Sequence, residues 1–195
     1  MKSMVKLGLA LALYAAAACV GLALVYTATA ETIAGHAQRN LEDALKEIFP
    51  QADDFEDSGE TIKNSGGGIV FSAAYKIFQN GNLAGVAVQA SGPGYGGTIT
   101  LLAGIDTAGI VRGVKILEHQ ESPGLGANIV SPRYYVDKVN KITFTGQFAG
   151  KSVKDPFEAK NDVEAITAST VSSRSVSNIV KAIARASAGF MEGGL

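Results

Sequence analysis

The chain has 195 residues, a formal net charge of −1, and acidic and basic residues spread along its length. This length suits one modest globular domain with an extra segment, and the near-neutral charge excludes the basic surface with which nucleic-acid-binding proteins hold phosphates. The single cysteine, Cys19, lies in an apolar N-terminal run and there are 2 histidines, so the folded part offers no disulfide, no cysteine-ligated cluster and no multi-histidine metal site.

The N-terminal segment is long and apolar enough to cross a membrane. No charged residue occurs from Leu7 to Ala30, and a helix needs about 20 apolar residues to span a bilayer core. Lys2 and Lys6 precede this run, which favours a cytoplasmic N-terminus and an extracytoplasmic domain. A cleaved signal peptide is the alternative, because Ala-Thr-Ala at 28–30 is typical of a cleavage site. The apolar run is longer than the usual signal core of about 7 to 15 residues, however, and we expect an anchor.

The remainder predicts an α+β domain built on a small antiparallel sheet. Apolar residues at helical spacing from Glu31 to Phe49 predict an amphipathic helix that Pro50 would end, and the acidic, glycine-rich stretch 53–68 predicts a loop. Short turns separate four apolar runs that are rich in β-branched residues, which indicates a meander of consecutive strands. These predicted strands are Ile69–Phe78, Leu83–Ala90, Thr98–Ile105 and Ile110–Glu118.

The last third of the chain predicts shorter elements and a closing helix. We expect a short helix over Pro132–Val139 and a strand near Ile142–Thr145. Apolar residues at helical spacing then predict a helix that begins at Ser172 or Ser173 and runs to Phe190. The serines at its start are suitable N-caps.

Hydroxyl side chains gather immediately ahead of this closing helix. Five of the seven residues from Thr167 to Ser173 are serine or threonine, and Arg174 follows. The first amides of a helix have no partner within it, its dipole favours negative charge there, and hydroxyls and a guanidinium bind phosphate oxygens well. On the residues alone, the segment is either an anion site or only a polar helix cap.

The same segment resembles the flavinylation motif of the FMN-binding domain family, Asp-x-x-Ser/Thr-Gly-Ala-Thr/Ser. In that family the last hydroxyl residue forms a phosphodiester with FMN, and the matching residue here is Thr170. The sequence departs from the motif with Glu164 in place of Asp, Ala168 in place of Gly and Ser169 in place of Ala. The resemblance implies FMN attached covalently to Thr170, with Thr167, Ser169 and Ser173 close to it.

A second motif supports this interpretation from another part of the chain. The stretch Glu118–Gly126, with the sequence EHQESPGLG, resembles the family's Glu-x-x-Glu-Thr/Ser-Pro-Gly-Leu-Gly signature. A Pro-Gly turn followed by another glycine lets the backbone approach a flat ring. The turn Gly92–Gly97 also resembles the family's Gly-Tyr-x-Gly element. The residues expected around the flavin are Glu121, Pro123, Gly124, Leu125, Gly126 and Tyr95. His119 is more typical of an ordinary residue at a strand end, and we expect no catalytic residue.

The combined pattern resembles the G-subunit family of Rnf electron-transport complexes, whose sister family is the C subunit of sodium-pumping NADH:quinone reductases. The resemblance implies an electron relay within a ferredoxin:NAD⁺ oxidoreductase that moves sodium or protons, with no turnover of its own. It also implies other Rnf-type subunits as partners, a separate flavin transferase for maturation, and an inner-membrane location with the FMN domain on the periplasmic side. The alternatives are a C-type quinone reductase subunit, a stand-alone extracytoplasmic flavin reductase, and a non-enzymatic membrane-anchored binding module.

These interpretations divide the chain into four parts. We expect a cytoplasmic N-terminus over 1–6, a transmembrane helix over 7–29, an amphipathic helix with a connecting loop over 30–66, and an FMN-binding domain over 67–195.

Overall fold

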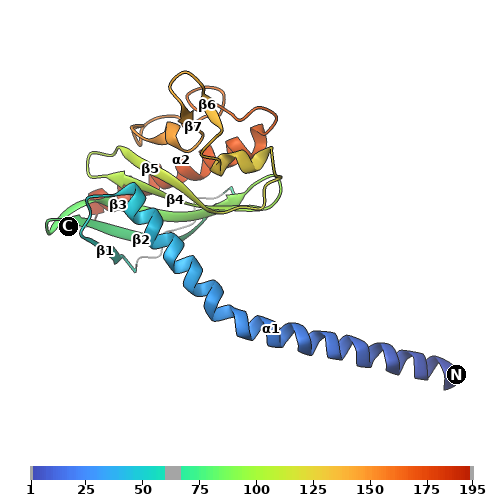
Figure 1. The fold of residues 1–195 in the computed structure, drawn as a ribbon. Helices are drawn as coiled ribbons and strands as arrows, with labels where there is room; N and C mark the ends of the chain where they lie inside the picture. Colours follow the sequence, from blue (N-terminus) through green and yellow to red (C-terminus); the bar gives the residue numbers. More distant parts are fainter. Residues whose placement is uncertain (1, 60–66, 194–195) are drawn as a thin grey trace. The chain divides into compact units, whose positions relative to one another are not determined.

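A computed structural model describes residues 2–59 and 67–193 of the chain. The chain forms two compact units, Met1–Asn40 and Leu41–Leu195. Helix α1 (Lys2–Ile48) makes up the described part of the first unit and continues into the second (Figure 1). It covers the predicted membrane helix and the predicted amphipathic helix without a break. The helix ends before Pro50, as expected for a residue that disfavours a helical conformation in the residue before it.

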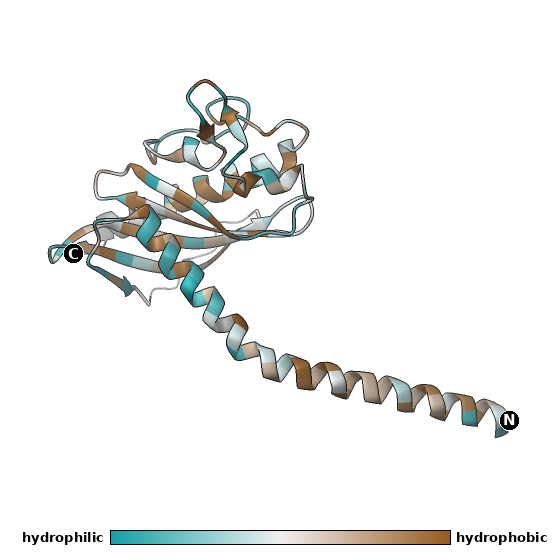
Figure 2. Ribbon diagram, in the orientation of Figure 1, coloured by the Kyte–Doolittle hydropathy of each residue, from teal (hydrophilic) through white to brown (hydrophobic). Residues whose placement is uncertain are grey.

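The first part of α1 has the composition of a membrane-spanning helix. Figure 2 shows mostly apolar colours along this part and hydrophilic colours toward the C-terminal end of the helix. By length and composition, α1 is sufficient to cross a bilayer. Its large apolar side chains, Leu9, Leu13 and Leu22 among them, are exposed.

The second unit is built on a five-stranded sheet whose strands pair with their sequence neighbours and are all antiparallel. The strands are β1 (Asp54–Asp57), β2 (Val70–Gln79), β3 (Asn82–Pro93), β4 (Thr98–Asp106) and β5 (Val111–Glu118). The four predicted strands and the meander topology are therefore confirmed.

Strand β1 corrects the prediction of a loop over 53–68. It lies at the edge of the sheet, where Phe55 pairs with Ile77, and its acidic residues remain mostly exposed. An edge strand needs only one paired side, so an acidic segment with a single apolar residue can join a sheet there. Part of the predicted loop, residues 60–66, lies outside the described residues.

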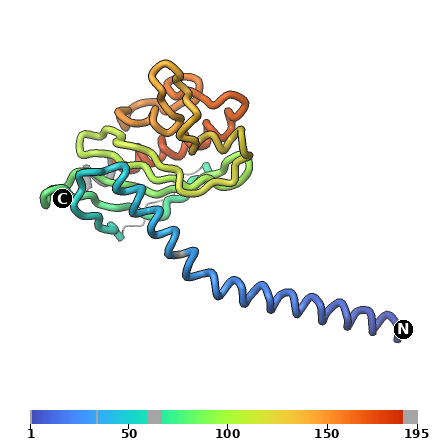
Figure 3. The backbone as a smooth tube through the Cα atoms, in the orientation of Figure 1, coloured from blue at the N-terminus to red at the C-terminus, as the bar shows by residue number. Residues whose placement is uncertain are grey.

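Both faces of the sheet are covered, which explains why its central strands are apolar on both sides. On one face, Leu101 and Ile99 of β4 pack in a core with Ile179 of helix α2 (Thr170–Gly193). On the other face, Leu102 packs with Leu45 and other residues at the end of α1. The backbone trace in Figure 3 lets the chain be followed from the meander through the irregular segment to α2. The observed architecture is the expected α+β class.

The segment between β5 and α2 has little regular structure. It contains the 3₁₀ helices η1 (Gly126–Val130) and η2 (Gly146–Phe148) and a small hairpin of β6 (Tyr135–Asp137) and β7 (Ile142–Thr143). The predicted strand near 142–145 is confirmed in this shorter form. The aromatic side chains of Phe144, Phe148 and Phe157 are fully buried and anchor the segment to the core.

The predicted helix over Pro132–Val139 is wrong. The carboxylate of Asp137 accepts hydrogen bonds from the amides of Val139 and Asn140, at 2.9 and 3.0 Å, and forms a turn that reverses the chain. Local side-chain bonds of this kind compete with a helix. Helix α2 also starts earlier than predicted, at Thr170, and its side chains from residue 188 onward lie outside the description.

Candidate functional site

A tight turn places Thr170 at the first position of α2. The amide of Ser169 donates to the carbonyl of Ile166 at 3.0 Å, and Ala168 between them has a φ of +61°. A side-chain-bearing residue in this left-handed region is strained, whereas glycine adopts it freely. The substitution of Ala168 for the family's glycine thus falls at the one position of the turn that favours glycine. Thr170 is partly exposed at the end of this turn.

Ser173 lies beneath the turn and holds it together. Its side chain is fully buried, and its hydroxyl accepts a hydrogen bond from the amide of Ile166 and donates one to the carbonyl of Ser169, both at 3.0 Å. The amide of Thr167, on the outer side of the turn, donates to the Tyr134 hydroxyl at 3.3 Å. The hydroxyl of Ser173 is therefore engaged within the protein.

Ser169 differs from its neighbours because its hydroxyl is both buried and unpaired among the described residues. The side chain is 6% exposed, and in the described part of the chain its Oγ has no hydrogen-bond partner. Burying a hydroxyl without a partner costs free energy, about 1 to 3 kcal/mol. Ser169 also lines a surface hollow beside Thr170. A hydroxyl buried beside such a hollow without a partner keeps its capacity to donate a hydrogen bond.

Glu121 connects three segments that are distant in sequence. Its Oε1 accepts hydrogen bonds from the amides of Tyr95 and Gly96 at 2.7 and 3.2 Å, and its Oε2 accepts one from the Ser172 hydroxyl at 2.7 Å. The side chain is 6% exposed. A Cβ added to Gly126 would overlap this carboxylate, so glycine at this position leaves room for it. The carboxylate thereby fixes the Tyr95 turn and the start of α2 relative to each other.

The hollow beside Thr170 has a volume of about 390 Å³, within the usual range for ligand sites. Exposed apolar side chains stand at its edge: Tyr95, 74% exposed, with Leu125 and Val171. The remaining lining residues are Glu121, Ser122, Gly126, Ala168, Ser169, Thr170 and Ser172. The structure thus brings both sequence motifs and Tyr95 to one site.

Not every predicted site residue lines this hollow. Pro123 and Gly124 are exposed in the loop that carries Leu125, outside the lining. Gly124 has a φ of +76°, so this position of the loop favours glycine. Thr167 lines a second, more polar hollow of about 620 Å³, which runs from Lys160 to Ala168 and also reaches Thr170. Thr170 lies at the border of the two hollows.

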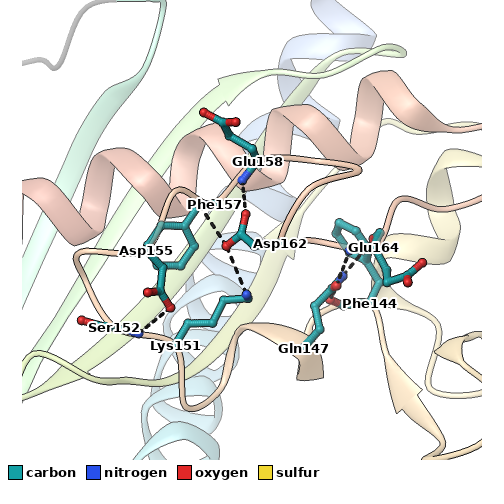
Figure 4. Close-up of polar contacts among 9 residues, drawn as sticks. All are labelled: Phe144, Gln147, Lys151, Ser152, Asp155, Phe157, Glu158, Asp162 and Glu164. Atoms are coloured by element: carbon teal, nitrogen blue, oxygen red, sulfur yellow. Dashed lines mark hydrogen bonds and ion pairs between the residues drawn. The ribbon is translucent and has the colours of Figure 1, made fainter.

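The segment that leads to the turn is held by a polar network (Figure 4). The carboxylate of Asp162 accepts hydrogen bonds from the amides of Phe157 and Glu158, at 3.2 and 2.6 Å, and pairs with the Lys151 ammonium at 3.1 Å. Burial alone would raise the pKa of Asp162, but these bonds outweigh it and lower that pKa below its ordinary value. The fold therefore stabilises the ionised form of Asp162.

Gln147 fixes the point at which the flavinylation-like motif begins. Its side-chain oxygen accepts from the amide of Glu164 at 2.7 Å, and its side-chain nitrogen donates to the carbonyls of Glu164 and Phe144 at 3.1 and 3.0 Å (Figure 4). The Glu164 side chain itself is exposed. The predicted site residues did not include Gln147, Tyr134 or Ser172, because no local sequence pattern signals their long-range bonds, even for Ser172 within the hydroxyl-rich segment.

His119 has a structural use. Its Nδ1 accepts a hydrogen bond from the amide of Glu121 at 3.2 Å, and its side chain is half-buried. This bond helps to orient the backbone that carries Glu121.

The sequence is similar to known proteins along most of its length. Residues 94–185, which include all the predicted site residues, match the FMN-binding domain, and residues 1–48 match the RnfG N-terminal region. The G subunit of the ion-translocating oxidoreductase complex of Methanosarcina acetivorans is 34% identical over 180 residues, which cover 90% of this chain and 89% of that protein. The G subunit of the Na⁺-translocating ferredoxin:NAD⁺ oxidoreductase complex of Acetobacterium woodii is 31% identical over 194 residues, with 91% and 88% covered. Among solved structures, Shewanella oneidensis NqrC aligns with a TM-score of 0.45 and 18% identity over 69% of this chain and 66% of that one.

Proposed function

Because the chain belongs to the G-subunit family of ion-translocating oxidoreductase complexes, we propose that it is an electron-relay subunit of an Rnf-type ferredoxin:NAD⁺ oxidoreductase. In this proposal it carries FMN linked through a phosphodiester to Thr170. The observation that carries the proposal is the position of Thr170, a partly exposed residue with a hydroxyl group, at the start of α2 and between two hollows.

The residues around Thr170 fit FMN in their chemistry. The N-terminus of a helix favours a phosphodiester, because its free amides and its dipole both stabilise negative charge. Tyr95, Leu125 and Val171 supply apolar surface for a flat ring. The hydroxyl of Ser169, buried beside this surface, is a hydrogen-bond donor that the described part of the chain leaves unused. We therefore assign the hollow lined by Tyr95, Leu125 and Val171 to the flavin ring. The more polar hollow, which runs from Lys160 to Ala168, is assigned to the phosphate group of FMN.

The predicted site residues then divide by role. Thr170 forms the bond, and Ser169 and Thr167 face the two hollows on either side of it. Ser173 and Glu121 act indirectly, since their polar atoms are engaged in holding the turn and the walls of the hollow. Pro123 and Gly124 shape the loop that presents Leu125, with Gly126 leaving room for the carboxylate.

FMN supplies the ability to accept and to donate electrons one or two at a time, which no side chain of this chain offers. The protein's part is to hold the ring at a fixed place and to set its electrostatic surroundings. A covalent bond keeps the flavin on the protein outside the cytoplasm. We propose that α1 crosses the inner membrane once with its N-terminus in the cytoplasm, that a separate flavin transferase forms the bond, and that electrons pass between the flavin and neighbouring subunits.

The test is mass spectrometry of the full chain purified from its native membrane, with peptide mapping. We expect an adduct with the mass of FMN on the peptide that contains Thr170. Thr170→Val, which keeps the side-chain shape without the hydroxyl, should abolish the adduct, whereas Thr170→Ser should retain it. Thr145→Val serves as the matched control, because Thr145 lies in the irregular segment before α2 and outside both hollows.

An unmodified Thr170 peptide from cells that contain the flavin transferase would overturn the covalent assignment. A colourless protein without any flavin would favour the binding module instead. Co-purification with integral membrane subunits supports the role within a complex, whereas a flavinylated protein isolated alone and active toward a soluble acceptor would favour the stand-alone reductase.

A further inference from the structure

Glu121 is a buried acidic residue without a basic partner. Its side chain is 6% exposed, and among the residues that the structure describes it forms no ion pair. Three hydrogen bonds, from the amides of Tyr95 and Gly96 and from the Ser172 hydroxyl, are its observed partners. Dipoles of this kind stabilise a carboxylate but add no compensating unit charge.

This carboxylate lies against the hollow assigned to the flavin ring. Glu121 is among the residues that line the hollow, together with Tyr95 and Leu125. Added Cβ atoms at Gly94 and Gly126 would overlap its two oxygens, so the absence of side chains at both positions lets the carboxylate reach this wall. With 6% of the side chain exposed, water has little contact with the carboxylate, and a charge acts more strongly on a neighbour where water does not screen it.

We infer that the Glu121 carboxylate is a fixed negative charge beside the flavin and lowers the flavin's midpoint reduction potential. The inference rests on the proposed attachment of FMN at Thr170. Reduction adds electrons to the ring, and a nearby negative charge opposes this addition. The bond from Ser172 offsets part of the charge, because the positive end of the hydroxyl dipole points at Oε2. The same carboxylate therefore holds the wall of the site and sets how readily its cofactor is reduced.

Two substitutions separate this electrostatic effect from a structural one. Glu121→Gln removes the charge and keeps the side-chain shape, so the midpoint potential should rise. Ser172→Ala keeps the charge and removes a hydrogen bond that offsets it, so the potential should fall. A general loosening of the site would admit water in both variants and move both potentials in the same direction.

The experiment is a redox titration of the flavinylated full chain, purified in detergent from cells that contain the flavin transferase. Glu118→Gln is the control, because it changes the net charge equally at an exposed position near Glu121 in sequence and should leave the potential unchanged. Shifts of opposite sign in the two variants support the inference. Shifts of the same sign, or an unchanged potential in Glu121→Gln, would overturn it. If Glu121→Gln does not fold, Ser172→Ala decides alone, since any result other than a fall contradicts the inference.

The adduct mass of each preparation distinguishes this inference from the proposed function. Wild-type chain without FMN on Thr170 refutes the proposed attachment. If the variants carry FMN but their midpoint potentials do not shift in opposite directions, only the role of Glu121 is refuted.

Discussion

The Oε2 atom of Glu121 lies 2.7 Å from the hydroxyl of Ser172, a residue 51 positions further along the chain, and both side chains are buried. This bond joins the second motif to the first turn of α2, the helix that starts with Thr170. One carboxylate therefore joins three segments that line the proposed flavin site: the second motif, the Tyr95 turn and the start of α2.

A double-mutant cycle should detect this bond as a coupling. Glu121→Gln and Ser172→Ala should each lower the free energy of unfolding, and the double variant should lose less than the sum of the two, with a coupling of about 1 to 2 kcal/mol. The measurement is urea unfolding of the full chain in detergent, without flavin. Ser187 is the control partner for Glu121 in a second cycle, because its buried hydroxyl donates to the carbonyl of Ala184 in the same helix and, among the described residues, forms no bond with Glu121. A coupling with Ser172 no larger than that with Ser187 would contradict the prediction.

Ala168→Gly should stabilise the protein. Ala168 has a φ of +61°, and relief of left-handed strain outweighs the extra freedom of glycine in the unfolded chain by about 0.5 to 1 kcal/mol. Ala165→Gly is the matched control, because Ala165 lies outside the left-handed region, so glycine there removes a half-buried methyl group and adds the entropy cost without relieving strain. Thermal unfolding of the two variants should therefore shift in opposite directions. A lower melting temperature for Ala168→Gly would show that the turn is not strained.

The sheet could be predicted from the sequence because its signals are local. Apolar runs such as Thr98–Ile105, bounded by glycine-containing turns, identify strands, and short turns between them impose a meander. Edge strand β1 lacked this signal because one apolar residue, Phe55, suffices at an edge. The first half of the hairpin, with β6 and the turn after it, was predicted as a helix because the decisive feature, the carboxylate of Asp137 bound to two following amides, leaves the apolar spacing unchanged.

The candidate site residues could be predicted from motifs, but the hydrogen bonds that join the segments carrying them could not. Glu121 was expected near the flavin, and the structure places it in the lining of the hollow. Its partners Tyr95 and Ser172 lie far away along the chain, and no local pattern in one sequence reports such pairs. The unpaired hydroxyl of Ser169 was equally beyond prediction, because hydrogen-bond satisfaction depends on the complete fold.

Gly104→Ala should weaken the contact between the end of α1 and the sheet. A Cβ at Gly104 would overlap the side chains of Ile48 and Phe49, and overpacking of this kind costs about 1 to 3 kcal/mol. A Cβ at Gly113 would lie 3.3 Å from Ile48, close enough to be tolerated with a small adjustment. Gly113→Ala is thus the matched control. Limited proteolysis and urea unfolding should show the larger effect for Gly104→Ala, and equal effects would contradict the packing described.

The network around Asp162 should make the stability of the domain depend on pH in the acid range. The folded-state pKa of Asp162 lies below its ordinary value of 3.8 because the amides of Glu158 and Phe157 and the Lys151 ammonium together outweigh the effect of burial. A carboxyl group with a lowered pKa contributes stability above its unfolded-state value and loses that contribution as the pH falls through the folded-state value. Asp162→Asn removes the charge at every pH. Its deficit relative to wild type should be about 1 to 3 kcal/mol at neutral pH.

This deficit should begin to shrink as the pH falls below the ordinary pKa of 3.8 and should shrink further toward the folded-state pKa, since the wild-type carboxyl group takes up a proton first in the unfolded chain and then in the folded one. Urea unfolding of both proteins from neutral pH to about pH 3 measures the difference. The control is Glu158→Gln, which removes a carboxylate that is 57% exposed and pairs with Lys181 at 3.4 Å. An exposed ion pair of this kind contributes at most about 1 kcal/mol to the free energy of unfolding. A deficit in Asp162→Asn that stays constant down to the lowest pH would show that its charge does not stabilise the segment leading to Thr170.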